Sequence, residues 1–189
     1  MGGLRARLAS RNENKLRELA RALPGWELEL LDEGELPPEE GSTYYENART
    51  KARFGRSADA SGAWVLGEDS GIEVAALGGG PGVRSARWAD DPVASLLAEL
   101  RGVEGEGRRA RYVCELVCIS PADEELRGRG VLEGRIVDEP RGDEGFGYDP
   151  IFVPEGETRT VAELGNEWKA EHSHRARAAR ALLETLTRR

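Results

Sequence analysis

Short apolar runs alternate along the chain with segments in which apolar residues recur every three or four positions. The short runs indicate β-strands, and the longer period indicates amphipathic helices. Strands are expected at residues 4–9, 26–31, 64–67, 72–77, 111–120, 130–137 and 151–153, with the two longest as antiparallel neighbours. Helices are expected at residues 12–23, 43–61, 92–100 and 170–186. This alternation predicts an α/β fold with a twisted mixed sheet, helices on its faces and a cleft beside it.

Length and composition limit the possible classes of protein. The chain has 189 residues, which fits a single domain over residues 1–189, and its 39% hydrophobic content is that of a folded globular protein. No apolar run reaches the ~18 residues that a membrane span needs, and no signal peptide is evident. The net charge of −8 argues against non-specific binding of nucleic acid. We therefore expect a cytoplasmic protein with neither a membrane nor a nucleic-acid partner.

The scarce residue types also carry information. The positive charge is almost all arginine, and the only lysines are Lys15, Lys51 and Lys169. The two cysteines, Cys114 and Cys118, occur within one apolar run and have no CxxC pair or histidine cluster nearby. They are interpreted as small core residues rather than as zinc ligands.

A polar hexapeptide follows the first expected strand, where the first helix begins. It reads Ser10-Arg11-Asn12-Glu13-Asn14-Lys15. Free N–H groups and the positive end of the helix dipole at such a place favour an anion such as phosphate. Ser10 and Asn12 would add side-chain donors, and Lys15 would add a full charge. Taken alone, the same serine and asparagine are better explained as caps of the helix.

Two adjacent carboxylates, Glu68 and Asp69, stand between apolar runs at the expected end of a strand. Strand ends in α/β sheets are common places for sites. Paired carboxylates are costly there unless they are neutralised, and Mg²⁺ bound to phosphate would neutralise them. The alternative is an acidic loop in water, which the apolar neighbours on both sides disfavour.

An acidic loop expected at residues 33–42 is a second source of carboxylates. Glu39 or Glu40 could reach the same metal ion. Ser42 or Thr43 with Glu46 also matches a helix capping box, which the spacing favours for this segment.

The segment Gly145-Phe146-Gly147-Tyr148-Asp149-Pro150 places an aromatic ring between two glycines. Such a ring can stack on a nucleobase, which contributes roughly 1–3 kcal/mol. Asp149 can accept a hydrogen bond from a base N–H. A tight turn with Phe146 in the core is an equally good interpretation.

Basic residues gather near the start of the last expected helix. They are Lys169, His174 and Arg175. Lysine and arginine are donors only, and cations near a helix N-terminus oppose the dipole, which suggests a functional role. A solvated basic helix start is the alternative.

In this order the motifs resemble the inosine/xanthosine triphosphate pyrophosphatase family, over nearly the whole chain. Linking segments at residues 46–52, 77–87 and 146–150 agree with the family pattern. The family's acidic pair is often Asp-Asp where this chain has Glu68-Asp69, and its first motif often has Thr at Ser10. Both departures keep the functional group.

The resemblance implies a two-lobed fold with an elongated mixed sheet, a cleft between the lobes, and a homodimer. It implies hydrolysis of purine nucleoside triphosphates (ITP, dITP or XTP) to a monophosphate and pyrophosphate, with Mg²⁺ as cofactor. Asp69 and Lys15 are then catalytic, and the metal ligands are Asp69 with Glu39 or Glu40. The implied substrate-binding residues are Ser10, Arg11, Asn12, Glu13, Asn14, Lys15, Ser70, Phe146, Gly147, Tyr148, Asp149, Lys169, His174 and Arg175.

Two other functions fit the same motifs. One is a related house-cleaning pyrophosphatase that acts on pyrimidine or modified nucleotides. The other is a nucleotide-binding sensor without catalysis, against which Asp69 and Lys15 count.

Overall fold

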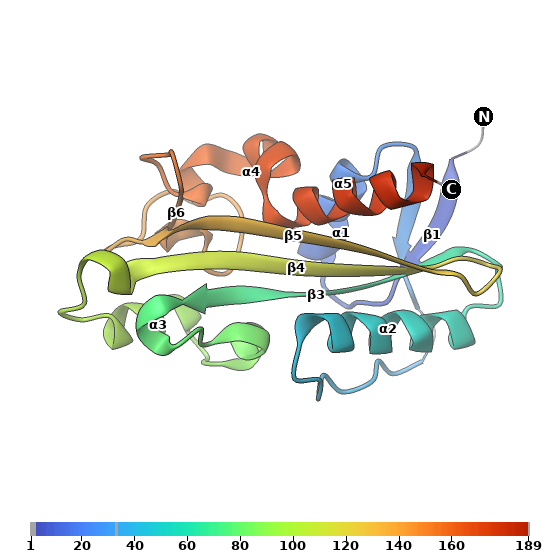
Figure 1. Cartoon of the computed structure of the whole chain (residues 1–189), viewed down its shortest axis with the longest axis horizontal. Coiled ribbons are helices and arrows are strands. Elements are labelled where there is room, and N and C mark those ends of the chain that lie inside the picture. Colours follow the sequence, from blue (N-terminus) through green and yellow to red (C-terminus); the bar gives the residue numbers. More distant parts are fainter. Residues whose placement is uncertain (1–2, 33, 189) are drawn as a thin grey trace. The chain divides into compact units, whose positions relative to one another are not determined.

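The computed structural model describes residues 3–32 and 34–188, so residue 33, where the expected acidic loop begins, lies outside the described residues. Its centre is a six-stranded sheet in the order β2-β1-β3-β4-β5-β6 (Figure 1). The strands are β1 (Leu4–Leu8), β2 (Trp26–Leu30), β3 (Trp64–Val74), β4 (Arg109–Ile119), β5 (Glu125–Ile136) and β6 (Phe152–Pro154). β1 is parallel to β2 and β3, whereas β6 is antiparallel to β5. The expected mixed sheet is confirmed.

Five helices accompany the sheet in the described residues. They are α1 (Glu13–Ala22), α2 (Tyr44–Ala58), α3 (Pro92–Glu99), α4 (Val161–His172) and α5 (His174–Thr187). Four 3₁₀ segments join them: η1 (Ala75–Leu77), η2 (Gly82–Arg87), η3 (Gly105–Arg108) and η4 (Asp149–Ile151). No helix in this part of the chain combines the length and apolar character of a membrane span.

The chain forms two compact units. The first consists of the described residues up to Asp69, of Cys114–Gly130, and of the chain from His174 onward. The second consists of Ser70–Val113 and Val131–Ser173. β3, β4 and β5 each contribute residues to both units, so neither unit is a continuous segment of the chain.

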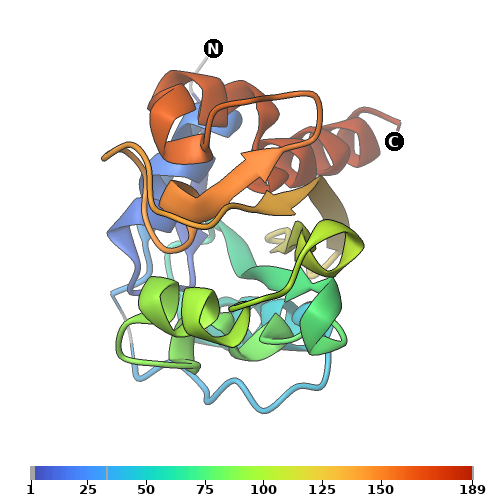
Figure 2. The same ribbon diagram turned by 90° about the vertical axis from the view of Figure 1, so that its left-hand side faces the viewer.

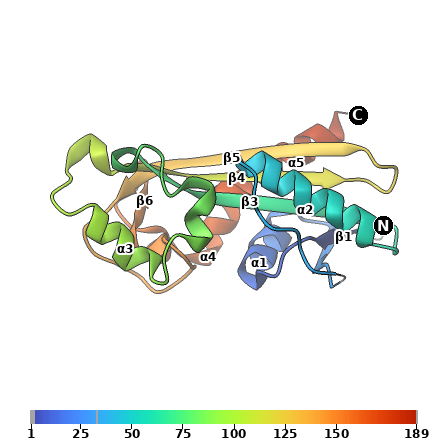
Figure 3. The ribbon, with the colours of Figure 1, turned by 90° about the horizontal axis from the view of Figure 1, so that it is seen from below.

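In the first unit, helices cover both faces of the sheet. α1 packs against α5 and β2, and α2 runs along β3 on the opposite face (Figures 1 and 3). The core between α1, α5 and the strands contains Leu8, Leu19, Leu66, Leu116 and Leu182, all fully buried or nearly so. Burial of such side chains contributes about 1.5–3 kcal/mol each, which fixes the strand that carries Glu68 and Asp69.

The second unit has its own core. Ile72, Leu96, Tyr112, Ile136 and Phe152 are among its buried members, and the rings of Tyr112 and Phe152 lie 4.6 Å apart. α4 packs against η4 and β6 (Figure 2). This packing brings the end of α4 to the segment at residues 145–150.

The carboxylate pair does not lie at a strand end, which corrects the sequence-based expectation. One strand, β3, runs without interruption from Trp64 to Val74, and residues 75–77 form η1 instead of continuing the strand. Glu68 and Asp69 are 1% and 3% exposed within it. A buried strand tolerates both carboxylates because cations from other elements neutralise them, and the linear sequence does not show those contacts.

The expectation of a single helix at residues 170–186 is also wrong. α4 ends at His172 and α5 begins at His174, with Ser173 in an extended conformation between them (φ −63°, ψ 161°). Most of α4 was missed because it has a non-helical glycine, Gly165, at φ 86°. That glycine interrupts the apolar period on which a helix prediction depends.

Strand β5 begins five residues before its expected start. The missed residues, 125–129, include a glycine between two exposed arginines, a pattern typical of a loop. Its glycine, Gly128, is needed because α5 approaches closely: a Cβ there would stand 2.1 Å from the carbonyl oxygen of Ala178. β4 and β5 are neighbours joined by residues 120–124, a connection too short for parallel strands, so the expected antiparallel pair is confirmed.

Candidate functional site

Glu68 is the centre of a buried charge network in the first unit. The Lys15 ammonium of α1 lies 2.6 Å from Glu68 Oε2, and Arg175 Nε of α5 donates to Glu68 Oε1 at 3.0 Å. Arg175 Nη1 also contacts Glu18 Oε2 at 3.0 Å. Glu68 accepts the Cys114 thiol as well, at 3.6 Å. Acid and base thus alternate from Lys15 through Glu68 and Arg175 to Glu18.

The charges of this network reinforce one another. Burial acts to raise the pKa of Glu68, but Lys15, Arg175 and Lys51 outweigh it and hold that pKa well below its usual value. Burial acts to lower the pKa of Arg175, yet Glu68 and Glu18 raise it. Both groups therefore stay ionised, and the Lys15 ammonium is held at one place.

The first prediction concerns acid stability. The pKa of Glu68 is lowered from 4.5, so its stabilising effect is complete above that pH and is lost as the pH falls below it. Glu68→Gln should lower the free energy of unfolding by about 3–5 kcal/mol near neutral pH, because two buried cations lose their partner. Urea unfolding at about pH 7 and about pH 3 should show a smaller pH dependence in the variant.

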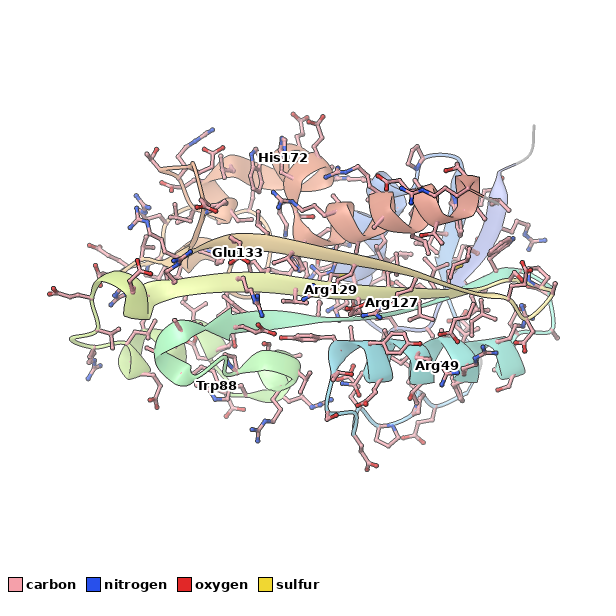
Figure 4. All side chains as sticks on the ribbon, in the orientation of Figure 1. Arg49, Trp88, Arg127, Arg129, Glu133 and His172 are labelled. Carbon is pink, nitrogen blue, oxygen red and sulfur yellow. The ribbon has the colours of Figure 1, made fainter. Side chains whose placement is uncertain are left out.

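Glu115→Gln is the matched control for that experiment. Glu115 is also buried, but its partners Arg127 and Arg129 have side chains about half exposed, at 48% and 52%. Both arginines belong to β5 and are labelled in Figure 4. They can be rehydrated, so this substitution should cost less; an equal loss in the two variants would contradict the role given to Glu68.

Asp69 is held by two residues of α2. Asn47 Nδ2 donates to Asp69 Oδ2 at 2.9 Å, and the Lys51 ammonium lies 3.6 Å from Oδ1. Asn47 and Lys51 are four positions apart, so they share one face of the helix. α2 approaches β3 this closely because Gly67 has no side chain; a Cβ there would stand 2.0 Å from the carbonyl oxygen of Ala48.

The acidic loop reaches the same place. Lys51 Nζ contacts Glu39 Oε1 at 2.7 Å, and the N–H of Gly41 donates to Asn47 Oδ1 at 2.8 Å. Asn47 therefore joins the loop to Asp69 through its two amide atoms. Burial raises the pKa of Asp69, and Lys51 opposes that rise. Burial acts to lower the pKa of Lys51, but the carboxylates around it outweigh burial and raise it.

This group of residues fits a magnesium ion. Within residues 3–32 and 34–188, no three acidic, histidine or cysteine side chains converge as a ready-made metal cluster. Two carboxylates, Glu39 and Asp69, nevertheless meet at the Lys51 ammonium. Mg²⁺ commonly takes one or two protein carboxylates and completes its shell with water and phosphate oxygens. Glu40 is exposed, so Glu39 is the better candidate of the two.

The hexapeptide at the start of α1 is a helix cap. Ser10 Oγ accepts the N–H of Asn12 at 3.1 Å, and Asn12 Oδ1 accepts the N–H groups of Asn14 and Lys15 at 2.9 and 3.2 Å. The expectation of free N–H groups is therefore wrong at these three positions, because the cap uses them. Arg11 donates to the carbonyl oxygens of Leu31 and Gly34, and Glu13 is exposed. Binding of phosphate by this segment stays a prediction.

In the second unit, Asp149 organises the aromatic segment. Lys169 Nζ lies 2.6 Å from Asp149 Oδ2, which also accepts the N–H of Phe146 at 2.9 Å. Tyr112 donates to Oδ1 at 3.2 Å. The Lys169 ammonium is 4.7 Å from the centre of the Phe146 ring, a cation–π contact. Gly145 is required at φ 81°, since a Cβ there would meet Asp149 Oδ2 at 2.2 Å.

The aromatic residues of this segment have different environments. Phe146 is partly exposed, so it is not a core residue. Tyr148 is buried, donates to the carbonyl oxygen of Ser85 at 3.2 Å, and has its pKa raised to about 12 by burial. Phe146 remains a candidate for base stacking, whereas Tyr148 supports the turn from inside.

The remaining expected residues have mixed placements. Ser70 is partly exposed in the second unit, and Gly147 is exposed. His174, the first residue of α5, is 4% exposed in the first unit. Arg175 belongs to the Glu68 network, which the sequence did not indicate. Direct contacts of these residues with a substrate stay predictions.

Sequence reasoning assigned no role to several residues of the first unit. They are Glu18, Asn47 and Lys51. The role of Glu68 in holding Lys15 was not indicated either. One signal was available for Asn47 and Lys51, which stand beside Ala48 and Ala52 on the small-residue face of a helix. A polar residue on an apolar helix face indicates a buried partner.

Fold and site together define an α/β protein in which two carboxylates, Asp69 and Glu39, meet at one buried ammonium. The Ham1 family model matches residues 6–185, and the chain belongs to this family, as the motifs indicated. A "dITP/XTP pyrophosphatase" of Thermus thermophilus is 47% identical over an alignment 192 residues long. The alignment covers 96% of this chain and 91% of that protein.

Two solved structures share the fold. The Staphylococcus aureus Ham1 protein superposes with a TM-score of 0.82 at 33% identity, covering 97% of this chain and 98% of that one. A Mycobacterium abscessus nucleoside-triphosphatase, also titled dITP/XTP pyrophosphatase, has a TM-score of 0.73 at 43% identity, with 96% and 99% coverage.

Proposed function

We propose that this chain hydrolyses non-standard purine nucleoside triphosphates (ITP, dITP and XTP) to the monophosphate and pyrophosphate. The observation that carries the proposal is the buried carboxylate of Asp69, which Asn47 orients and which meets Glu39 at the Lys51 ammonium. Relatives named dITP/XTP pyrophosphatases, 40–47% identical over nearly the full chain, support the same activity.

Each charged group has a place in this reaction. When bound between Asp69 and Glu39, Mg²⁺ would neutralise the phosphate oxygens and make phosphorus more electrophilic. Asp69 orients the attacking water and accepts its proton. The water oxygen forms a bond to the α-phosphorus, and the bond from that phosphorus to the α,β-bridging oxygen breaks. Lys15, held by Glu68, stabilises the negative charge on the leaving pyrophosphate.

The second unit supplies groups suited to a purine base. Hypoxanthine and xanthine present an O6 acceptor beside an N1–H donor, whereas adenine presents a donor beside an acceptor. Lys169 and Asp149 provide a donor beside an acceptor, which matches the first order. An unpaired buried polar group costs about 1–3 kcal/mol, so adenine is disfavoured. The partly exposed Phe146 ring stacks on the base.

Pyrophosphate release from a panel of triphosphates tests the function. ITP, dITP and XTP should give pyrophosphate rapidly with Mg²⁺, ATP and GTP should give little, and chelation should stop the reaction. Formation of a diphosphate and orthophosphate would contradict the proposal. Binding without turnover would favour the sensor, and preference for a pyrimidine nucleotide would favour the related pyrophosphatases.

We also propose a cytoplasmic location and a homodimer. A cytoplasmic location agrees with two buried free cysteines, and the homodimer rests on the sequence resemblance. The single domain over residues 1–189 is supported by strands that contribute to both units. We expect neither nucleic acid nor a membrane as partner.

A further inference from the structure

All three lysines of the chain contact carboxylates, but Lys51 differs from the other two. Lys15 contacts Glu68 at 2.6 Å, and Lys169 contacts Asp149 at 2.6 Å. Lys51 lies against two carboxylates from different segments, Glu39 at 2.7 Å and Asp69 at 3.6 Å. It is thus the lysine that bridges the two proposed metal ligands.

The contacts of Lys51 with the two carboxylates are largely buried. The side chains of Lys51 and Asp69 are 6% and 4% exposed, and that of Glu39 is 23% exposed. The Lys51 ammonium carries one positive charge, whereas a divalent cation carries two and would need the same carboxylate oxygens that the ammonium now contacts.

Of the groups around Asp69, the ammonium is the one able to move. Oδ2 is fixed by Asn47, whose other amide atom holds the Gly41 N–H. Those bonds tie the acidic loop to β3 without using Lys51. The lysine reaches the carboxylates through a flexible four-carbon stem. Its ammonium can therefore withdraw while both carboxylates stay in place.

We propose that Lys51 occupies the metal position in the metal-free protein and that a divalent cation displaces its ammonium from Glu39 and Asp69. The inference rests on the proposed function, because that function places the metal at these carboxylates. In this proposal the Lys51 ammonium keeps the two carboxylates together before the cation binds. The cation then competes with the ammonium for the carboxylate oxygens.

The low lysine content allows a direct test on the unaltered protein. With ¹³C at the lysine ε-carbon, the NMR spectrum contains signals from Lys15, Lys51 and Lys169 alone. Mg²⁺ added without nucleotide should shift the Lys51 signal strongly and leave the Lys169 signal unchanged. Lys51→Arg, which removes one signal, assigns it. Saturation with Mg²⁺, measured by calorimetry, without movement of the Lys51 signal would overturn the proposal.

A second experiment measures the competition itself. Lys51→Met keeps the apolar stem and removes the charge, so Mn²⁺ without nucleotide should bind at least tenfold more tightly than to the wild type by electron paramagnetic resonance. Lys169→Met is the matched control, because it removes a lysine from another buried carboxylate, and its Mn²⁺ affinity should be unchanged. Equal or weaker binding by Lys51→Met, or no binding by either protein, would overturn the proposal.

Stability and activity measurements separate the possible failures. Melting temperatures with and without Mn²⁺ show whether Lys51→Met is folded, and the wild-type NMR titration stands if it is not. Pyrophosphate release from ITP by the wild type is measured independently. If pyrophosphate is released but the Lys51 signal does not move, the proposed function stands and the displacement of Lys51 is wrong. If the Lys51 signal moves but no pyrophosphate is released, the displacement stands and the proposed function is wrong.

Discussion

Replacing Asp69 with asparagine should reduce pyrophosphate release from ITP by about 10²–10⁴-fold, the usual contribution of a positioned general base. Asparagine cannot accept the proton of water, and it is a weaker ligand for Mg²⁺. The fold should survive because the Asn47 amide can donate to the new side-chain oxygen as it does to Asp69 Oδ2. Steady-state turnover and a thermal melt would measure the two effects.

Asp59→Asn is a suitable control for this substitution. Asp59 is also buried in the first unit, where it contacts Arg56 and accepts the Ala63 N–H. It stands at the C-cap of α2, away from the residues that hold Asp69. This variant should lose stability but keep its turnover. Full activity of Asp69→Asn would remove that residue from the chemistry.

Lys169→Met should raise KM for ITP by about 10–100-fold and change kcat much less. A hydrogen bond from a charged donor contributes about 1.5–3 kcal/mol, and this one is proposed to act on the base, where no bond is broken. The variant should also lose about 3–5 kcal/mol of stability, since Asp149 stays buried without its cation. The side chains of the two residues are only 2% and 5% exposed.

A double variant separates the two roles of Lys169. Lys169→Met with Asp149→Asn replaces the ion pair by uncharged groups, so most of the lost stability should return. KM should stay high, because neither the cationic donor nor the anionic acceptor is restored. Recovery of both stability and KM would mean that Lys169 acts only through the fold of residues 145–150.

Sequence signals predicted the structure where they act between neighbouring residues. The caps of α1 and α2 were predicted correctly, because Asn12 and Thr43 act on N–H groups within three residues of themselves. Local signals failed where a distant segment decided the outcome. β5 tolerates glycine because α5 covers it, and Glu68 stays in a buried strand because α1 and α5 supply cations.

Sequence alone determined the class of fold, the family, and the candidate residues of the reaction. Periodicity and capping depend on neighbours along the chain, and the family resemblance depends on ordered motifs, so both can be read from the sequence. Tertiary structure alone decided the partners: Glu68 with Lys15 and Arg175, Glu39 with Lys51, and Asp149 with Lys169. The physical reason is that the ionisation and orientation of a buried charge depend on groups that folding brings from distant segments.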